Sequence, residues 1–564
     1  MTNMRIRVAP QSAGREDLLF WGIVLFVAAI AAAAPSLSMH HVFASYDLSF
    51  HLARIEGMKE ALLAGQFPVR INPVQLGGYG MPTEIFYPDL FLYPVALLRM
   101  AGLSVAACWN VFLIGNSLLT AFLGWWGFTL YTRSPRMGAI ASLFYLTALY
   151  RVMLTYISAA AGTIVAMAFF PLALAAVWMT LRRDASHWPL VVLGVTGILQ
   201  SHVLSAIFIV AAALLMAAAS LPRFREADVR RAAGKAVFWT ALLNLWYMAP
   251  FLYFQTHMDF LLKAVTQQDV RYEMIYPIRQ GECYIGSVMA LMLIGLGIQM
   301  VRRRREQERA REFWGLLILS AVVIVAVSRP HLWHLLGTAA GFLQFPGRLT
   351  VFPAVFVALA AAIGLAHARK GLVIVLAAAC LCGNLAWLHG ASLVLTPQEN
   401  AHRMLRTQRV TAENYLARHD IAYDGYRDYM DIRTAALFSD DAQLRQKFED
   451  RELRPAGRIE SVQRTGTSFD VRYAAGAAGE LQFPIFWYAG YTAQDAEGRE
   501  LPVRRDEMGQ VSVTLPAAGG ELHLHYAGLP WFHWVDGLSA LAWMAFLFLC
   551  YRGYRNQNHR RSFW

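Results

Sequence analysis

Residues 45–94 read SYDLSFHLARIEGMKEALLAGQFPVRINPVQLGGYGMPTEIFYPDLFLYP, a polar stretch rich in glycine and aromatic residues that lies between apolar segments. Apolar side chains recur at helical spacing over residues 48–63 and predict an amphipathic helix lying in a membrane interface. The charged residues of this helix fall largely on its other side: Arg54, Glu56, Lys59 and Glu60. The glycines and prolines of residues 65–82 then predict a compact loop built from turns. Residues 35–94 are therefore interpreted as a functional loop at a membrane surface.

The composition of the chain excludes an ordinary soluble protein. Hydrophobic residues make up 57% of the 564 residues, and charged residues make up only 16%. Apolar runs near bilayer length recur throughout, which is typical of an α-helical polytopic membrane protein. Twelve spans are predicted, near residues 18–34, 107–131, 138–154, 162–181, 189–202, 204–221, 236–255, 284–301, 313–327, 349–366, 372–390 and 534–551.

Basic residues determine the predicted orientation in the membrane. With twelve spans, the arginine-rich connections all fall on one side, which the positive-inside rule assigns to the cytoplasm. The first span follows a basic tail without a convincing cleavage pattern, so it is interpreted as a retained helix. Both termini are then cytoplasmic, and residues 45–94 lie outside. The formal charge of +12 comes largely from the same short loops, so we predict no nucleic-acid partner.

The composition changes after residue 390 and divides the chain into three parts. Residues 1–390 form the predicted transmembrane domain, and residues 391–533 have the composition of a water-soluble domain outside the membrane. This domain begins with a helical lead-in to about residue 455 and continues with runs that alternate at period two, which predict a small antiparallel β-sandwich. Residues 534–564 form the final span and a basic cytoplasmic tail.

Asp47 and His51 are the first candidate site residues in the loop. A carboxylate just beyond a first membrane helix is suited to act as general base on an acceptor hydroxyl, although Asp47 could instead cap the helix that follows it. His51 lies one helical turn later and could orient Asp47. A divalent ion shared by Asp47, His51 and either Glu84 or Asp89 is a further possibility, whereas the five cysteines indicate neither a disulfide framework nor a metal site.

Other polar and aromatic residues of the outer connections are candidates for substrate binding. Within the loop these are Arg54, Tyr79, Glu84, Tyr87 and Asp89. His202 belongs to a polar cluster at an outer turn, which is costly unless it lines a cavity, and the alternative is an ordinary hairpin turn. Arg329 and Arg348 lie at outer helix mouths, where a guanidinium fork suits a phosphate or diphosphate. The alternative for Arg348 is contact with lipid headgroups.

Several of these motifs together resemble a known family. They are GQFPVRINPVQLGGYGMP, FYPDLFLYP, QSHVLS and LQFPGR, preceded by Asp47 and followed by the β-domain and a closing span. This order resembles bacterial polytopic membrane proteins that carry a 6-pyruvoyl-tetrahydropterin-synthase-related region. The wider group, with the YfhO-like proteins, is similar to the GT-C glycosyltransferases. The chain lacks the histidine cluster of the soluble pterin synthase, so the regional label implies no pterin chemistry.

The resemblance implies an inner-membrane enzyme that transfers a sugar from a polyprenyl-phosphate carrier to an envelope glycan or lipid acceptor on the outer face. The acidic residue that acts as base in GT-C enzymes corresponds to Asp47, and their phosphate-side arginine corresponds to Arg348. The second acid that many of them carry is absent, because Leu48 and Ser49 follow Asp47. Two alternatives stay open: a transporter or flippase of lipid-linked glycans, and a non-catalytic assembly factor for envelope polysaccharide.

Overall fold

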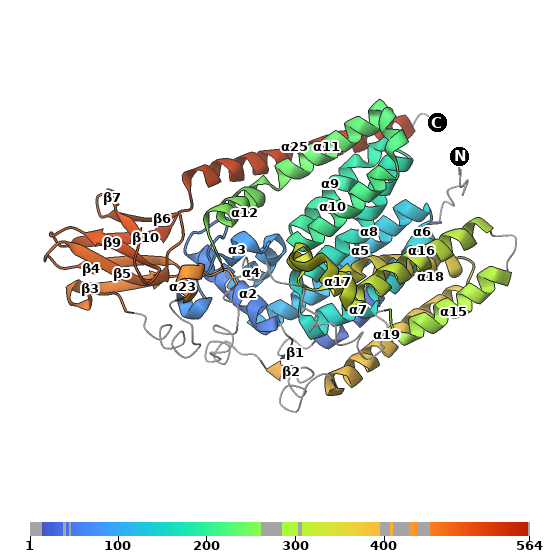
Figure 1. Cartoon of the computed structure of the whole chain (residues 1–564), viewed down its shortest axis with the longest axis horizontal. Coiled ribbons are helices and arrows are strands. Elements are labelled where there is room, and N and C mark those ends of the chain that lie inside the picture. The colour runs from blue at the N-terminus through green and yellow to red at the C-terminus, as the bar shows by residue number, and fades with distance from the viewer. Residues whose placement is uncertain are drawn as a thin grey trace. The chain divides into compact units, whose positions relative to one another are not determined.

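The computed structural model describes residues 14–37, 41–43, 45, 47–260, 285–302, 307–394, 407–409, 428–436 and 452–561. The chain divides into two compact units, each built from three separate segments (Figure 1). Unit 1 comprises Met1–Tyr46, Asn110–Ala241 and Gln267–Gln408. Unit 2 comprises Asp47–Trp109, Leu242–Thr266 and Arg409–Trp564. Unit 2 thus contains both the predicted outer loop and the C-terminal β region.

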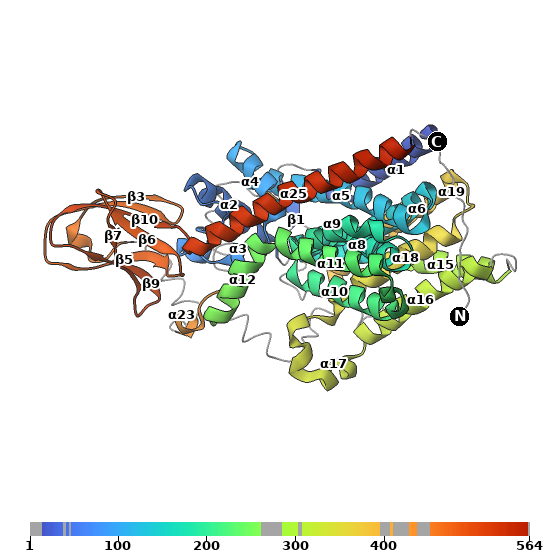
Figure 2. The same cartoon turned by 90° about the horizontal axis from the view of Figure 1, so that it is seen from above.

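Unit 1 is a helical body. Its elements are α1 (Arg15–Ala32), most of α5 (Val105–Thr132), α6 (Pro135–Leu146), α7 (Leu149–Met153), a π-helical turn (Leu154–Ser158), α8 (Ala161–Arg182), α9 (Trp188–Leu199), α10 (Val203–Ala218), most of α11 (Ala227–Leu243), α15 (Ser287–Arg302), α16 (Gln307–Val327), α17 (Pro330–Leu336), α18 (Val351–Gly364) and α19 (Lys370–Val394). Helix α8 lies beside α9 and α10 in both views (Figure 1, Figure 2). Small residues permit such close packing: a Cβ on Gly194 of α9 would lie 2.7 Å from the Cα of Ala173.

The predicted spans correspond to helices throughout. Among the described residues, six helices are long and apolar enough to cross a membrane, and the number is eight if each of two bent helix pairs counts as one span. The bent pairs are α6 with α7, at 44°, and α11 with α12 (Leu245–His257), at 71°. The other four predicted segments overlap α1, α9, α10 and α15. A multi-span helical body is therefore confirmed, while the count of twelve stays a prediction.

Residues 47–94 of the predicted outer loop and the β region make up most of unit 2. The loop folds into α2 (Leu48–Leu63), a short α3 (Thr83–Phe86), a 3₁₀ turn (Leu90–Leu92) and α4 (Tyr93–Met100). The unit also contains α12, α23 (Ile432–Ala436) and the long α25 (Pro530–Arg561), which includes the predicted final span. The predicted helical lead-in lies mostly outside the described residues.

The β region is a sandwich of two antiparallel sheets, as predicted. The strands are β3 (Ile459–Thr465), β4 (Ser468–Tyr473), β5 (Gly479–Phe486), β6 (Tyr491–Asp495), β7 (Glu500–Leu501), β8 (Val503–Arg505), β9 (Gln510–Leu515) and β10 (Gly520–Tyr526). One sheet has the order β3-β4-β10-β6-β7 and the other β5-β9-β8. Leu522 of β10 pairs with Val471 of β4, and both side chains are buried. The period-two positions of the sequence therefore form the core between the sheets.

Candidate functional site

Asp47 begins α2, in the N-cap position that the sequence leaves open as an alternative to a catalytic role. Its carbonyl oxygen accepts the first helical hydrogen bond from the backbone N–H of His51, with an N–O distance of 3.1 Å. Its side chain makes no capping hydrogen bond to the first turn. The residue is half-buried. Asp47 is therefore the N-cap residue of α2, but its carboxylate does not cap the helix.

His51 is held among aromatic rings in the first turn of α2. The imidazole is buried and stacks on Trp109, with 5.7 Å between ring centroids and 13° between planes. Tyr87 meets it edge to face, also at 5.7 Å, and Phe50 does so at 5.1 Å. Aromatic packing of this kind fixes the orientation of a ring. His51 and Tyr87, two of the predicted site residues, are thus in direct contact.

Arg54 lies one turn further along α2 and joins it to the rest of the loop. Its Nε lies 3.6 Å from Oε1 of Glu84, and both side chains are almost completely buried. Its Nη2 donates to the backbone carbonyls of Tyr87 and Pro88, at 3.0 Å each. The guanidinium also lies over the Tyr87 ring, 4.4 Å from its centroid. The structure therefore brings together four of the predicted site residues: Arg54 contacts Glu84 and Tyr87, and Tyr87 contacts His51.

Asp89 adds a second buried carboxyl to this cluster. Burial raises the pKa of Glu84, while the charge of Arg54 and a hydrogen bond from Asn72, at 3.2 Å, oppose the rise. Burial and the charge of Glu84 raise the pKa of Asp89 to about 7, again opposed by Arg54. The charge of one guanidinium thus opposes the pKa rise of both carboxyl groups.

Short-range hydrogen bonds explain why the loop folds in this way. The backbone of Asn72 pairs with that of Met81 in both directions, at 2.8 and 3.0 Å. The Asn72 side chain accepts from the N–H groups of Val74 and Gln75 while it donates to Glu84. Gly80, at a φ of 84°, supplies a left-handed turn that favours glycine. Asn72, which the sequence analysis did not single out, is therefore the residue that connects the turns to the buried acid.

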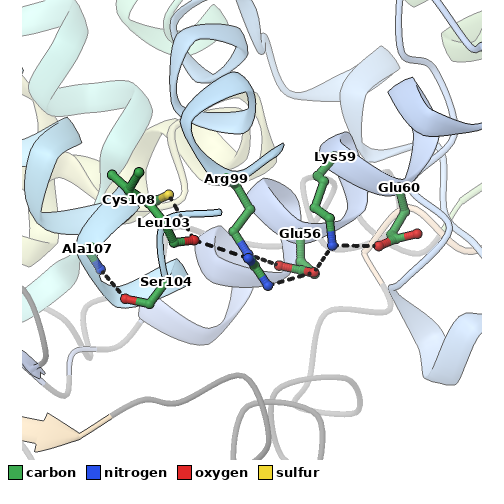
Figure 3. Close-up of polar contacts among 8 residues, drawn as sticks. All are labelled: Glu56, Lys59, Glu60, Arg99, Leu103, Ser104, Ala107 and Cys108. Atoms are coloured by element: carbon green, nitrogen blue, oxygen red, sulfur yellow. Dashed lines mark hydrogen bonds and ion pairs between the residues drawn. The ribbon is translucent and has the colours of Figure 1, made fainter. Parts of the chain in front are cut away.

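Two charged residues on the expected polar side of α2 are more buried than the predicted interfacial position implies. Arg54 and Glu56, on its expected polar side, are both buried. Figure 3 shows the reason at Glu56, which binds Arg99 of α4 at 2.7 Å and Lys59 at 2.9 Å. Lys59 also pairs with Glu60 at 2.9 Å. Arg54 and Glu56 therefore contact other parts of unit 2, whereas Lys59 and Glu60 stay partly exposed, and the position of α2 at a membrane interface stays a prediction.

Tyr79 lies in a different part of unit 2. Its side chain is buried and packs on Phe486 of the sandwich, with 5.0 Å between ring centroids. Its carbonyl oxygen accepts from the backbone N–H of Phe486 at 2.8 Å. Tyr79 therefore joins the loop to the β-domain and exposes no ring face on which a sugar could stack.

Three predicted site residues belong to unit 1. His202 caps α10 through Nδ1, which accepts from the Ser205 N–H at 3.3 Å and lies 2.9 Å from its hydroxyl. The charge of Arg348 acts on this imidazole, and Arg348 itself donates to the Leu343 carbonyl at 3.0 Å. Arg329 precedes α17 with an exposed side chain. His202 thus caps the helix that follows the turn, within reach of the charge of Arg348, and its role in substrate binding stays a prediction.

The shared metal site considered from the sequence is not formed. Among the described residues, no group of three or more His, Cys, Asp or Glu side chains is arranged to hold a metal ion. Asp47, His51, Glu84 and Asp89 are all described and do not make such a group. Glu84 contacts Arg54 and Asn72 instead.

No protein-family model and no curated protein matches the sequence. Among solved structures, the chain is similar to arabinofuranosyltransferase AftD from Mycobacteria, with 16% identity, a TM-score of 0.43 and coverage of 72% of this chain but only 29% of that one. It is also similar to ArnT from Cupriavidus metallidurans bound to undecaprenyl phosphate, with 13% identity, a TM-score of 0.38 and coverage of 69% and 67%. A third similar structure is the oligosaccharyltransferase of Archaeoglobus fulgidus in the apo form. Its identity is 12% and its TM-score is 0.37, with coverage of 71% of this chain and 61% of that one. Likenesses this distant do not by themselves assign an activity.

Proposed function

We propose that the chain is a GT-C-type membrane glycosyltransferase, which moves a sugar from a polyprenyl-phosphate carrier to an envelope glycan or lipid acceptor on the outer face of a bacterial inner membrane. The observation that carries this proposal is the position of Asp47 at the start of an immobilised helix. Two residues in the middle of α2 anchor it, Arg54 to Glu84 and Glu56 to Arg99. A general base must be held in a fixed geometry relative to the proton that it takes, and such anchoring provides it.

The proposed reaction is a single displacement with inversion at the anomeric carbon. The acceptor hydroxyl oxygen forms the new bond to this carbon as the bond from the carbon to the carrier's phosphate oxygen breaks. The carrier phosphate leaves with the bonding electron pair, and Asp47 takes the proton of the hydroxyl. His51, which contacts Trp109 and Tyr87, orients Asp47 or the acceptor hydroxyl. Arg348 offers a cation to the departing phosphate.

The test is the mass of envelope glycans and glycolipids from cells with the intact protein, without it, or with Asp47→Asn. We expect one sugar-sized mass increment to disappear equally in the null and in the Asp47→Asn strain. Asp470→Asn, an exposed carboxylate on β4 of the sandwich, is the matched control and should leave the glycans unchanged. The amount of each variant in the membrane fraction must be equal.

The same experiment separates the two alternatives. A transporter or an assembly factor would deplete a glycan in the null strain without requiring a base. If the Asp47→Asn strain keeps the complete glycans that the null strain lacks, the enzyme proposal is wrong. Accumulation of the complete lipid-linked glycan on the cytoplasmic face of the null strain would then identify a transporter.

A further inference from the structure

Arg151, in the helical body of unit 1, is a buried arginine to which neither the sequence analysis nor the proposed reaction gives a role. It lies on α7 and is only 2% exposed. Its Nη2 donates to the Ser117 hydroxyl at 3.0 Å, and its Nη1 donates to the Leu146 carbonyl at 3.4 Å. Its Nε has no hydrogen-bond partner. Within the part of the chain that the structure describes, the guanidinium therefore meets only neutral groups.

Three other arginines show how this chain otherwise treats a shielded guanidinium. Arg54 pairs with Glu84, Arg70 with Asp536 at 2.7 Å, and Arg99 with Glu56 at 2.7 Å. Each of the three is thus balanced by a carboxylate within the same unit. An unbalanced charge in the interior of a membrane protein is costly, and such residues commonly mark a substrate or ion site. An anion from outside the described part of the protein would therefore balance the charge of Arg151.

The backbone around Arg151 is irregular in a way that suits a binding site. The span bends by 44° between α6 and α7, continues as the π-helical turn and ends at Ala159 in the left-handed region, at a φ of 53°. Asn384 of α19 donates to the carbonyl of Thr147 at the bend, at 2.8 Å. Irregular backbone at membrane depth is tolerated where protein or a polar site satisfies it, and π-helical turns are frequent at functional sites. The Leu146 carbonyl at this bend is the one that accepts from Arg151.

We infer that Arg151, with Ser117 beside it, binds the phosphate group of a lipid-linked substrate. A phosphate oxyanion balances the guanidinium and accepts its paired N–H donors, which a planar fork matches well. A phosphate with an apolar tail reaches a site among membrane helices more readily than a hydrated ion does, because the tail is itself soluble in the bilayer. The choice of lipid rests on the proposed function, whereas the need for an anion rests on Arg151 alone.

The test is equilibrium binding to the purified full-length protein in detergent, measured by native mass spectrometry. The probes are a polyprenyl phosphate, the polyprenol of the same length and inorganic phosphate as competitor. The variants are Arg151→Gln, Arg151→Lys and Arg136→Gln. Arg136 is the matched control, because it donates to the backbone carbonyl of Ala368 elsewhere in the same unit. Thermal unfolding of each variant establishes that it is folded.

We expect Arg151→Gln to weaken polyprenyl phosphate binding about tenfold or more, with Arg151→Lys between it and the intact protein and Arg136→Gln unchanged. Polyprenol should bind weakly and equally to all of them. Equal binding of polyprenyl phosphate to the intact protein and to folded Arg151→Gln would overturn the inference. Displacement by inorganic phosphate, with the same dependence on Arg151, would assign the site to free phosphate and overturn the lipid source.

Binding at equilibrium requires no sugar transfer, so the outcome is separable from that of the proposed reaction. Asp47→Asn should bind polyprenyl phosphate as the intact protein does. If transfer proves independent of Asp47 while binding depends on Arg151, the proposed base is wrong and the phosphate site stands. If binding is independent of Arg151 while Asp47→Asn abolishes transfer, the phosphate site is wrong and the proposed base stands.

Discussion

The two units bury an arginine in opposite ways. In unit 2, Arg54 meets Glu84, two backbone carbonyls and the face of Tyr87. In unit 1, Arg151 meets one hydroxyl and one carbonyl, with Nε unbonded. The difference teaches that burial alone does not tell whether a charge serves stability or a ligand. A charge balanced inside the protein stabilises the fold, whereas an unbalanced one indicates a group from outside.

The largest expected effect follows from removing the cation of the balanced cluster. Arg54→Gln leaves Glu84 and Asp89 buried without a counter-charge, and breaking a buried pair in this way costs about 3–5 kcal/mol. The measurement is the free energy of unfolding in detergent. Arg472→Gln, in the exposed pair with Glu521, is the control and should change little. A small loss in Arg54→Gln would mean that the cluster does not depend on its charge balance.

The second effect concerns the pH dependence of the same cluster. Because burial raises the pKa of Asp89 from 3.8 to about 7, the folded state binds more protons than the unfolded state between these values. The stability that this group contributes is therefore fully present below pH 4 and is lost as the pH rises towards 7. The charge of Glu84 also raises the pKa of Asp89, while the charges of Arg54 and Arg70 and a hydrogen bond with Tyr93 lower it.

Asp89→Asn should remove this dependence. We expect the variant to gain roughly 1–3 kcal/mol relative to the intact protein as the pH rises from 5 to 8, because the amide cannot ionise. Comparing unfolding free energies of the two proteins at each pH cancels the other titrating groups. Parallel curves over this range would show that Asp89 is ionised throughout and that Arg54 balances both acids.

A smaller effect is expected from the ion pair between α2 and α4 (Figure 3). Arg99→Gln removes the 2.7 Å bond to Glu56 but leaves Lys59 in contact with the same carboxylate at 2.9 Å. Because the pair is partly exposed and one cation remains, the expected loss is about 1 kcal/mol in the unfolding free energy. A loss as large as that of Arg54→Gln would show that the anchoring of α2 depends mainly on α4.

The smallest effect on stability is expected from the unbalanced arginine. Arg151→Gln removes a buried charge that has no acidic partner, so without ligand the unfolding free energy should change by less than about 1 kcal/mol or increase. Unfolding of delipidated protein is the measurement. A loss near that of Arg54→Gln would place Arg151 among the stabilising charges and remove the contrast between the units.

The sequence predicts the backbone elements better than the surroundings of the polar groups. Residues 48–63 form a helix with the predicted bounds, and alternating positions such as Val471 and Leu522 face the sandwich core. These patterns are local, because period and composition within one segment determine them. The surroundings of Arg54 could not be read in this way, since Glu84 and Tyr87 are brought to it by turns thirty residues away.

Two signals in the sequence point to residues that the initial interpretation omitted. Arg151 is the only charged residue of the predicted span 138–154, and a charge within a span is a functional signal in itself. Asn72 precedes a proline in a turn-rich stretch, which is typical of an asparagine that bonds nearby backbone. Its hydrogen bond to Glu84, twelve residues away, depends on the tertiary fold and has no local pattern.

The central claim is that Asp47 acts as a base in sugar transfer, and the most direct measurement uses purified protein in liposomes. The substrates are lipid-linked sugars and acceptor extracted from host membranes, and the readout is the rate at which a sugar leaves its carrier phosphate. We predict that Asp47→Asn lowers this rate by about 10²-fold or more while polyprenyl phosphate binding is unchanged. Transfer at the intact rate by folded Asp47→Asn would contradict the account.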